Sequence, residues 1–181
     1  MSQELDLLKI VCERLSVAGI DYMITGSTAG NFYAVPRMTR DIDLVVEVRK
    51  EDTDKLVKLF KNDFYIERES ILEAIRQQGM FNIIHNDYVI KLDFIIRKNT
   101  SYRILEFQRR KKMNIEGTNI WVVSPEDLIL SKLCWAKDSF SEIQLRDVKN
   151  LLSVDKNMDT LYLEQWIHLL GLEKIYERAK Q

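Results

Sequence analysis

The chain has 181 residues, enough for one domain or for a compact domain with an appended segment, and enough to bury a core without staples. Lysine and arginine total 27 against 28 acidic residues, which excludes a globally basic nucleic-acid-binding surface and leaves only local patches. The apolar runs are too short to cross a bilayer and Met1–Glu4 begins no signal peptide, so we expect a soluble, cytoplasmic protein without a membrane partner.

The chain before residue 124 alternates between helical and strand-like patterns. Apolar spacing and capping residues predict helices over 3–18, from a turn at 26–30 to Val35, from Thr53 through Phe60, and from a capping box at Ser70 to Gly79. Short apolar or alternating runs predict strands over 21–25, 41–48, 80–85, 88–97 and 120–123. Two of these strands form a hairpin over Asn86-Asp87, whereas residues 102–107 fit either a strand or a short helix.

Beyond residue 124 every pattern is helical. Ser124-Pro125-Glu126-Asp127 combines an N-cap, a proline at the first helical position and acids in the first turn. The expected helices span roughly 125–137, 141–153, 159–170 and 172–180. We therefore divide the chain into a mixed α/β core, residues 1–123, and a helical segment, residues 124–181, that packs on the core.

The most informative pattern is a set of three aspartates that follows a glycine-serine turn, Gly26-Ser27, able to hold phosphate. Asp41 and Asp43 lie two apart on a strand, so their side chains point to the same face. Asp93 stands among apolar neighbours on a later strand, where burying a carboxylate is costly without a compensating partner. Such carboxylates suit Mg²⁺, and two Mg²⁺ ions can hold a nucleoside triphosphate and an incoming hydroxyl.

Each part of this pattern also has a plainer interpretation. Asp41 and Asp43 fit a solvent-facing strand edge with alternating charge, and Asp93 fits an outward acid paired with Lys91. Glycine-serine turns are common on their own. The order strand, turn, helix and acidic strand is what makes the combination specific.

These residues resemble a known superfamily. Gly26-Ser27, Asp41-Ile42-Asp43 and Lys91-Leu92-Asp93 are similar to the nucleotidyltransferase-fold superfamily of the DNA polymerase β type. Within it, the chain most resembles the AbiEii-type nucleotidyltransferases, which include toxins of type IV toxin–antitoxin systems; the matching runs are Thr39–Val46, Ser124–Leu133 and Gln144–Val148. The resemblance covers most of residues 20–155 and implies an α/β (α+β) nucleotidyltransferase fold, a twisted mixed sheet flanked by helices with a C-terminal helical segment.

The resemblance also implies roles for the matching residues. Gly26 and Ser27 would contact the triphosphate through backbone amides and the hydroxyl, and Asp41 and Asp43 would hold the metal ions. Asp93 would bind the catalytic metal and help to activate the acceptor hydroxyl.

Two further functional residues of the family map onto the helical segment. They correspond to Lys132 and Asp147, of which Lys132 suits a phosphate or a developing negative charge. A surface salt bridge between helices is the alternative for this pair. The capping positions of Glu126 and Asp127 explain those two acids adequately.

Two observations concern basic residues. The common form of the family's turn carries a basic residue that the Gly26–Gly30 segment lacks, and Arg37 and Arg40 are candidates to replace it. Arg109–Lys112 is the one dense basic run; it could steer a polyanion toward the acids, or it is a solvated loop.

We therefore expect Mg²⁺-dependent transfer of a nucleoside monophosphate from an NTP to a hydroxyl, with release of pyrophosphate. An RNA 3′ end, a protein side chain and a small molecule such as an antibiotic all remain open as acceptors. The alternatives are a non-catalytic nucleotide-binding or regulatory protein and a toxin–antitoxin component that keeps the fold. The apolar side of the last helices could pack on the core or on a second subunit, which leaves a homodimer open.

Overall fold

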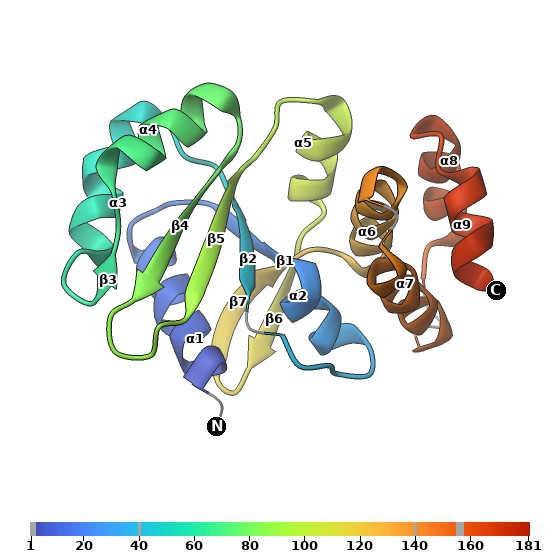
Figure 1. The fold of residues 1–181 in the computed structure, drawn as a ribbon, viewed down its shortest axis with the longest axis horizontal. Coiled ribbons are helices and arrows are strands. Elements are labelled where there is room, and N and C mark those ends of the chain that lie inside the picture. The colour runs from blue at the N-terminus through green and yellow to red at the C-terminus, as the bar shows by residue number, and fades with distance from the viewer. Residues whose placement is uncertain (1–2, 40, 140, 155–157) are drawn as a thin grey trace.

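A computed structural model describes residues 3–39, 41–139, 141–154 and 158–181. Strands and helices alternate up to residue 124, and only helices follow (Figure 1). In chain order the elements are α1 (Gln3–Val17), β1 (Tyr22–Thr25), α2 (Gly26–Tyr33), β2 (Ile42–Val46), the 3-10 turn η1 (Lys50–Asp52), α3 (Thr53–Phe60), β3 (Phe64–Tyr65), α4 (Arg68–Gln77), β4 (Met80–His85), β5 (Lys91–Ile96), α5 (Ser101–Gln108), β6 (Lys111–Ile115), β7 (Thr118–Val122), α6 (Pro125–Ser139), α7 (Glu142–Val154), α8 (Thr160–Leu169) and α9 (Glu173–Lys180).

The strands form one mixed seven-stranded sheet in the order β3-β4-β5-β2-β1-β7-β6. The pairs β2–β5 and β1–β7 are parallel, and the other neighbours are antiparallel. On β2 the buried residues alternate with half-buried ones, as expected for a strand whose two faces differ. The predicted mixed sheet flanked by helices is therefore confirmed.

The helices cover the sheet unequally. In Figure 1, α3 and α4 lie beyond β4, whereas α6 to α9 stand together on the opposite side of the molecule. Helix α2 contacts β1 and β2 as well as α6 and α7, so it connects the sheet to the helical segment. None of the helices in the described part of the chain is both long and apolar enough to span a bilayer.

The core continues from the sheet into the helical segment. Four aliphatic side chains of α6 are completely buried, and each contributes about 1.5–3 kcal/mol through the hydrophobic effect; they are Leu128, Ile129, Leu130 and Leu133. Buried residues from α1 to α9 belong to one cluster. Because both parts share this core, the core does not separate residues 1–123 from residues 124–181. The division of the chain into these two parts stays a prediction.

A buried polar cluster fastens α6 to its neighbours. The predicted cap is confirmed, since the backbone N–H of Asp127 donates to Ser124 Oγ over 3.1 Å. The Asp127 carboxylate also accepts hydrogen bonds from Ser124 Oγ at 2.6 Å, Tyr162 Oη at 2.6 Å and Arg109 Nε at 3.1 Å. Glu126 accepts the backbone N–H of Asp159, which opens α8, at 3.1 Å. These acids therefore bind α5 and α8 to α6 in addition to capping it.

The basic run Arg109–Lys112 differs from both of its predicted forms. Arg109 is bound to Asp127, its guanidinium 3.7 Å from the centre of the Tyr162 ring, and Arg110 pairs with Asp21 at 2.8 Å. Lys111 and Lys112 begin β6, an edge strand that the sequence pattern does not predict. Two of the four charges are thus neutralised within the protein, which argues against a polyanion-steering patch.

Of the two forms left open for residues 102–107, the structure shows the short helix, α5, whose N-cap is Thr100. Two other local predictions need correction. Helix α4 begins at Arg68, because the Ser70 hydroxyl donates to Glu67 instead of capping a helix at Ser70. The chain between β4 and β5 is longer than a two-residue turn and includes Val89 at φ 54°, so β5 begins only at Lys91.

Candidate functional site

The two strand aspartates are direct neighbours in the sheet. Asp43 of β2 lies opposite Asp93 of β5 in the parallel pairing, and on its other side it lies opposite Thr25, the last residue of β1. Residues in register on neighbouring strands point to the same face, so the two carboxylates share one face. Asp93 is buried and only 6% exposed, whereas the side chain of Asp41, which precedes β2, is 64% exposed. The sheet thus brings Asp43 and Asp93 together, with Asp41 at its rim.

Lys91 supplies positive charge next to these acids. Its Nζ atom lies 2.8 Å from Asp93 Oδ2 and 3.9 Å from Asp41 Oδ1. The hydrogen bond to Asp93 raises the pKa of Lys91, which holds the ammonium in its charged form. The plainer prediction of an Asp93–Lys91 pair is correct about the partner, but Asp93 is buried and does not point outward.

The pairing leaves negative charge uncompensated. Among the described residues, Asp93 Oδ1 is buried without a hydrogen-bond partner. Burial raises the pKa of Asp43, and repulsion from Asp93 and Asp41 raises it further. An orphaned carboxylate oxygen beside mutually repelling acids fits a divalent cation, which would satisfy both at once. Nevertheless, no three carboxylate, histidine or cysteine side chains of the described ranges are arranged to hold a metal ion.

Gly26 begins α2 directly beside Asp43. Its φ of +64° is a left-handed conformation that favours glycine, and an added Cβ would lie 2.0 Å from Asp43 Oδ2. Thr25, the N-cap of α2, makes no side-chain capping bond. The start of α2 therefore has no side-chain cap and lies next to Asp43, and a helix start is the end that favours anions. Gly26 and Ser27 belong to this helix start and not to a separate turn.

Lys132 and Asp147 form the other half of the site. They come from α6 and α7, and their Nζ and Oδ2 atoms are 2.8 Å apart. The alternative prediction of a salt bridge between helices is correct about the pairing, but both residues are buried, at 4% and 9% exposure, and do not lie on the surface. Gln144 accepts a second hydrogen bond from Lys132 at 3.1 Å. The close approach of α2 helps to bury Lys132, since a Cβ at Gly30 would lie 3.9 Å from Lys132 Cε.

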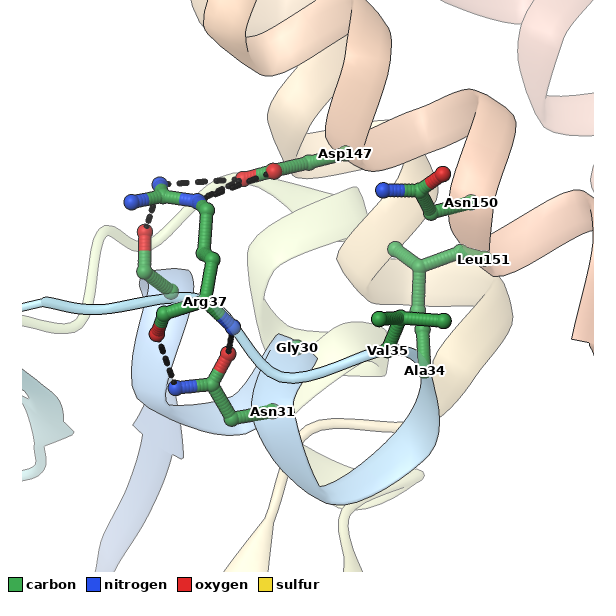
Figure 2. A pocket seen from close by; sticks show the side chains of 9 residues that line it. Gly30, Asn31, Ala34, Val35, Arg37, Asp147, Asn150 and Leu151 are labelled. Atoms are coloured by element: carbon green, nitrogen blue, oxygen red, sulfur yellow. Dashed lines mark hydrogen bonds and ion pairs between the residues drawn. The ribbon is translucent and has the colours of Figure 1, made fainter.

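Arg37, in the segment between α2 and β2, joins the two halves. Its Nε donates to Asp147 Oδ1 at 3.0 Å and its Nη2 to Asp147 Oδ2 at 3.1 Å, and Nη2 also donates to Ser27 Oγ. Figure 2 shows the guanidinium directed at Asp147 and the Arg37 backbone bound to the side chain of Asn31. The signal for Arg37 in the sequence is a basic residue just ahead of the acidic strand; the other candidate, Arg40, lies outside the described residues.

The charges of this half depend on burial and on mutual contact. Burial alone would raise the pKa of Asp147, but the hydrogen bonds from Arg37 and Lys132 hold it below its usual range. Burial lowers the pKa of Lys132, although the contact with Asp147 opposes that shift. Lys132 opposes part of the rise in the pKa of Asp43, so the two halves interact electrostatically. The site thus has acids at the sheet, with the cations Arg37 and Lys132 beside them, an arrangement that suits a metal-bound polyphosphate.

Similar folds occur in solved structures. An antigenic nucleotidyltransferase-like protein from Paracoccidioides brasiliensis is 20% identical, with a TM-score of 0.56 over 96% of this chain and 90% of that one. A lincosamide antibiotic adenylyltransferase with lincomycin bound is 14% identical, with a TM-score of 0.57 over 86% of this chain and 99% of that one. ANT(2″)-Ia in complex with adenylyl-2″-tobramycin is 13% identical, with a TM-score of 0.53 over 99% and 100%. At these identities the likeness establishes the fold.

Sequence comparison identifies the family. No curated protein sequence matches the chain significantly. A family model described as "Nucleotidyl transferase AbiEii toxin, Type IV TA system" matches residues 16–148, a range that contains every candidate site residue from Gly26 to Asp147. The resemblance expected from the motifs is thereby confirmed, and the chain belongs to the AbiEii family of nucleotidyltransferases.

Proposed function

We propose that this protein transfers a nucleoside monophosphate from an NTP, bound with Mg²⁺, to a hydroxyl acceptor. The observation that carries the proposal is the in-register pair Asp43 and Asp93, with a buried, unpartnered carboxylate oxygen, beside the uncapped start of α2 at Gly26. A structural acid pair would be fully compensated. Membership of the AbiEii family and the nucleotidyltransferase fold support the same reaction class.

The family resemblance implies a role for each residue, and the position of each residue is compatible with that role. Asp41, Asp43 and Asp93 would hold one or two Mg²⁺ ions, which would neutralise phosphate charge and make the acceptor hydroxyl easier to deprotonate. The backbone amides of Gly26 and Ser27, together with the Ser27 hydroxyl, receive the triphosphate. Asp93 helps to activate the acceptor, and Lys132, kept charged by Asp147, offsets the charge of the leaving pyrophosphate.

The reaction exchanges a phosphoanhydride bond of the NTP for a phosphoester bond to the acceptor. The acceptor oxygen forms a bond to the α-phosphorus, and the bond from that phosphorus to the oxygen bridging to the β-phosphate breaks. Pyrophosphate takes the bonding electrons, and the hydroxyl proton passes to Asp93 or to solvent. Lys132 stabilises the charge that develops on pyrophosphate, so the helical half of the site acts on the leaving group.

Calorimetric titration with a non-hydrolysable ATP analogue, with and without Mg²⁺, tests the binding part of the proposal. We expect Mg²⁺-dependent binding that Asp43→Asn abolishes, because this change removes a central carboxylate. Asp21→Asn is the matched control, since Asp21 adjoins β1 but pairs with Arg110 outside the site. Equal binding by Asp43→Asn and the wild-type protein would overturn the site.

Label transfer tests the chemistry and identifies the acceptor. Each of the four α-labelled NTPs is incubated with total RNA, with protein extract and with an antibiotic panel. The panel is included because one structure of similar fold is a lincosamide antibiotic adenylyltransferase and another is a complex with adenylyl-2″-tobramycin. We expect label in one acceptor class and none with Asp93→Ala. Metal-dependent binding without any transfer would instead favour a non-catalytic, nucleotide-binding protein.

A further inference from the structure

Arg37 has a guanidinium that two different groups of the site share. One edge of it binds the Asp147 carboxylate through Nε and Nη2, and Nη2 also binds Ser27 Oγ. Within the described part of the chain, the remaining nitrogen, Nη1, donates only to the carbonyl of the next residue, Met38, at 3.3 Å. The proposed function assigns the Ser27 hydroxyl to the triphosphate. The Arg37 guanidinium, which is charged and has five N–H donors, therefore already binds the hydroxyl that the triphosphate would contact.

The charges around Asp147 are not balanced. Arg37 and Lys132 both bind this single carboxylate, with Lys132 Nζ and Arg37 Nη2 sharing Oδ2 at 2.8 and 3.1 Å. Two cations against one anion leave an excess positive charge next to Ser27. Asp41, Asp43 and Asp93 carry the opposite excess, because Lys91 is the one cation that contacts this group, through Asp41 and Asp93, among the described residues. An anion that also carries Mg²⁺ would compensate both halves at once.

The backbone of Arg37 makes hydrogen bonds of its own that help to hold the loop. The Arg37 N–H donates to Asn31 Oδ1 and Asn31 Nδ2 donates to the Arg37 carbonyl, each at 2.9 Å. The side chain is 33% exposed and lines a small pocket together with Ser27, Gly30 and Asn150 (Figure 2). These backbone contacts thus help to anchor the loop, and the guanidinium stays accessible to a ligand.

We propose that Arg37 binds the triphosphate of the substrate, a proposal that rests on the proposed function above. On binding, the guanidinium fork donates to phosphate oxygens in place of Ser27 Oγ and part of its contact with Asp147. Lys132 keeps Asp147 as its own partner. Arg37 thereby performs the task of the basic residue missing from the Gly26–Gly30 segment, and it reaches the phosphates from the far side of α2.

Binding of inorganic tripolyphosphate with Mg²⁺ tests this role without any contribution from a base or sugar. We expect Arg37→Ala to weaken binding at least about tenfold, because hydrogen bonds to charged groups are among the strongest in proteins. Arg37→Lys keeps the charge but loses the planar fork, so it should recover only part of the affinity. With a non-hydrolysable ATP analogue the same losses should appear, whereas adenosine binding should be unchanged.

Arg14→Lys is the matched control. Arg14 also binds an aspartate through two nitrogens, with 2.7 and 2.6 Å to Asp63, and its side chain is 31% exposed, but it lies outside the site. This variant should bind tripolyphosphate as the wild-type protein does, while thermal unfolding reports any loss of stability in both variants. Equal tripolyphosphate binding by Arg37→Ala and wild type, both folded, would overturn the role of Arg37 alone. Absence of Mg²⁺-dependent binding by the wild-type protein would overturn the proposed function together with it.

Discussion

Asp93 and Asp127 are both buried aspartates, but their surroundings differ. Asp127 is completely buried, and both of its carboxylate oxygens accept hydrogen bonds, from Ser124 and Arg109 on one side and Tyr162 on the other. Asp93 has Lys91 on Oδ2, whereas its Oδ1 lacks a hydrogen-bond partner among the described residues. One carboxylate is compensated on both sides and the other on one side only.

The difference teaches how to recognise a functional acid. Burial alone does not distinguish the two residues, and neither does the presence of a cationic partner. What distinguishes them is incomplete pairing, reinforced at Asp93 by a second acid, Asp43, in register beside it. A buried carboxylate oxygen without a hydrogen-bond partner lowers the stability of the protein. Such groups are found more often at functional sites than elsewhere.

Removing Asp93 should have the largest effect of all, and it should fall on catalysis. We expect Asp93→Ala to lower the rate of label transfer by about 10²- to 10⁴-fold, because the acceptor loses the group that activates it. Nucleotide should still bind, since Asp41, Asp43 and the start of α2 remain. Single-turnover kinetics and calorimetry on the same preparation separate the two effects. Unchanged turnover would remove Asp93 from the mechanism.

Removing Asp127 should act on stability instead. Asp127→Ala leaves Arg109 with only the longer 3.5 Å contact to Glu126 and removes the side-chain hydrogen bonds to Ser124 and Tyr162, so we expect the unfolding free energy to fall by about 3–5 kcal/mol. Urea denaturation measures this loss. Asp21→Ala, which breaks the more exposed pair with Arg110, should cost no more than about 1 kcal/mol. If Asp127→Ala were as stable as wild type but inactive, the contrast between the two aspartates would fail.

Asp43→Asn should change the free energy of unfolding by less than Asp127→Ala does, and it should raise this free energy instead of lowering it. Burial and the neighbouring acids raise the pKa of Asp43 in the folded state, so ionised Asp43 lowers stability above that pKa. The asparagine variant should therefore be more stable than wild type at pH 7 in the presence of a chelator. The gain should disappear as the pH falls below the unfolded-state pKa of aspartate, where both forms are neutral. Thermal unfolding at several pH values measures it, and a destabilised variant at pH 7 would contradict it.

The smallest expected effect is a shift in pH dependence. Burial lowers the pKa of Lys132 while Asp147 opposes the shift, so tripolyphosphate binding should weaken in alkaline solution below the pH at which an ordinary lysine titrates. Asp147→Asn removes the opposing contact, so the loss of tripolyphosphate affinity on the alkaline side should begin at a lower pH. Dissociation constants measured across the alkaline range test the shift. If affinity fell over the same pH range in the variant and in the wild-type protein, Asp147 would not control the titration of Lys132.

The sequence predicts the elements that carry the candidate site better than it predicts the edge of the sheet. Alternation on β2, an acid among apolar residues on β5 and a strong helix start at Ser124 are local signals, and each leads to the observed element. Strand β6 has no such signal, because an exposed edge strand that begins with Lys111 and Lys112 lacks the apolar alternation of a half-buried strand. Its place depends on its antiparallel pairing with β7.

The side-chain contacts of Arg37, like the place of β6, depend on parts of the chain that are distant in sequence. A basic residue before the acidic strand can be recognised as a candidate, but its partners Ser27 and Asp147 are ten and 110 positions away. Only the packing of α2 against α7 brings them together. Long-range polar contacts of this kind cannot be derived from spacing or propensity, since neither carries information about which helices meet.

The site is assembled from residues that are far apart in the sequence, and this affects when it can form during translation. The segment between the paired strands β2 and β5 contains α3, β3, α4 and β4, and Lys132 and Asp147 come only with α6 and α7. A nascent chain that ends before Asp147 has emerged from the ribosome therefore lacks part of the site, whatever its earlier segments have folded into. In a family that includes toxins, activity would begin only once nearly the whole matched region has been made and folded.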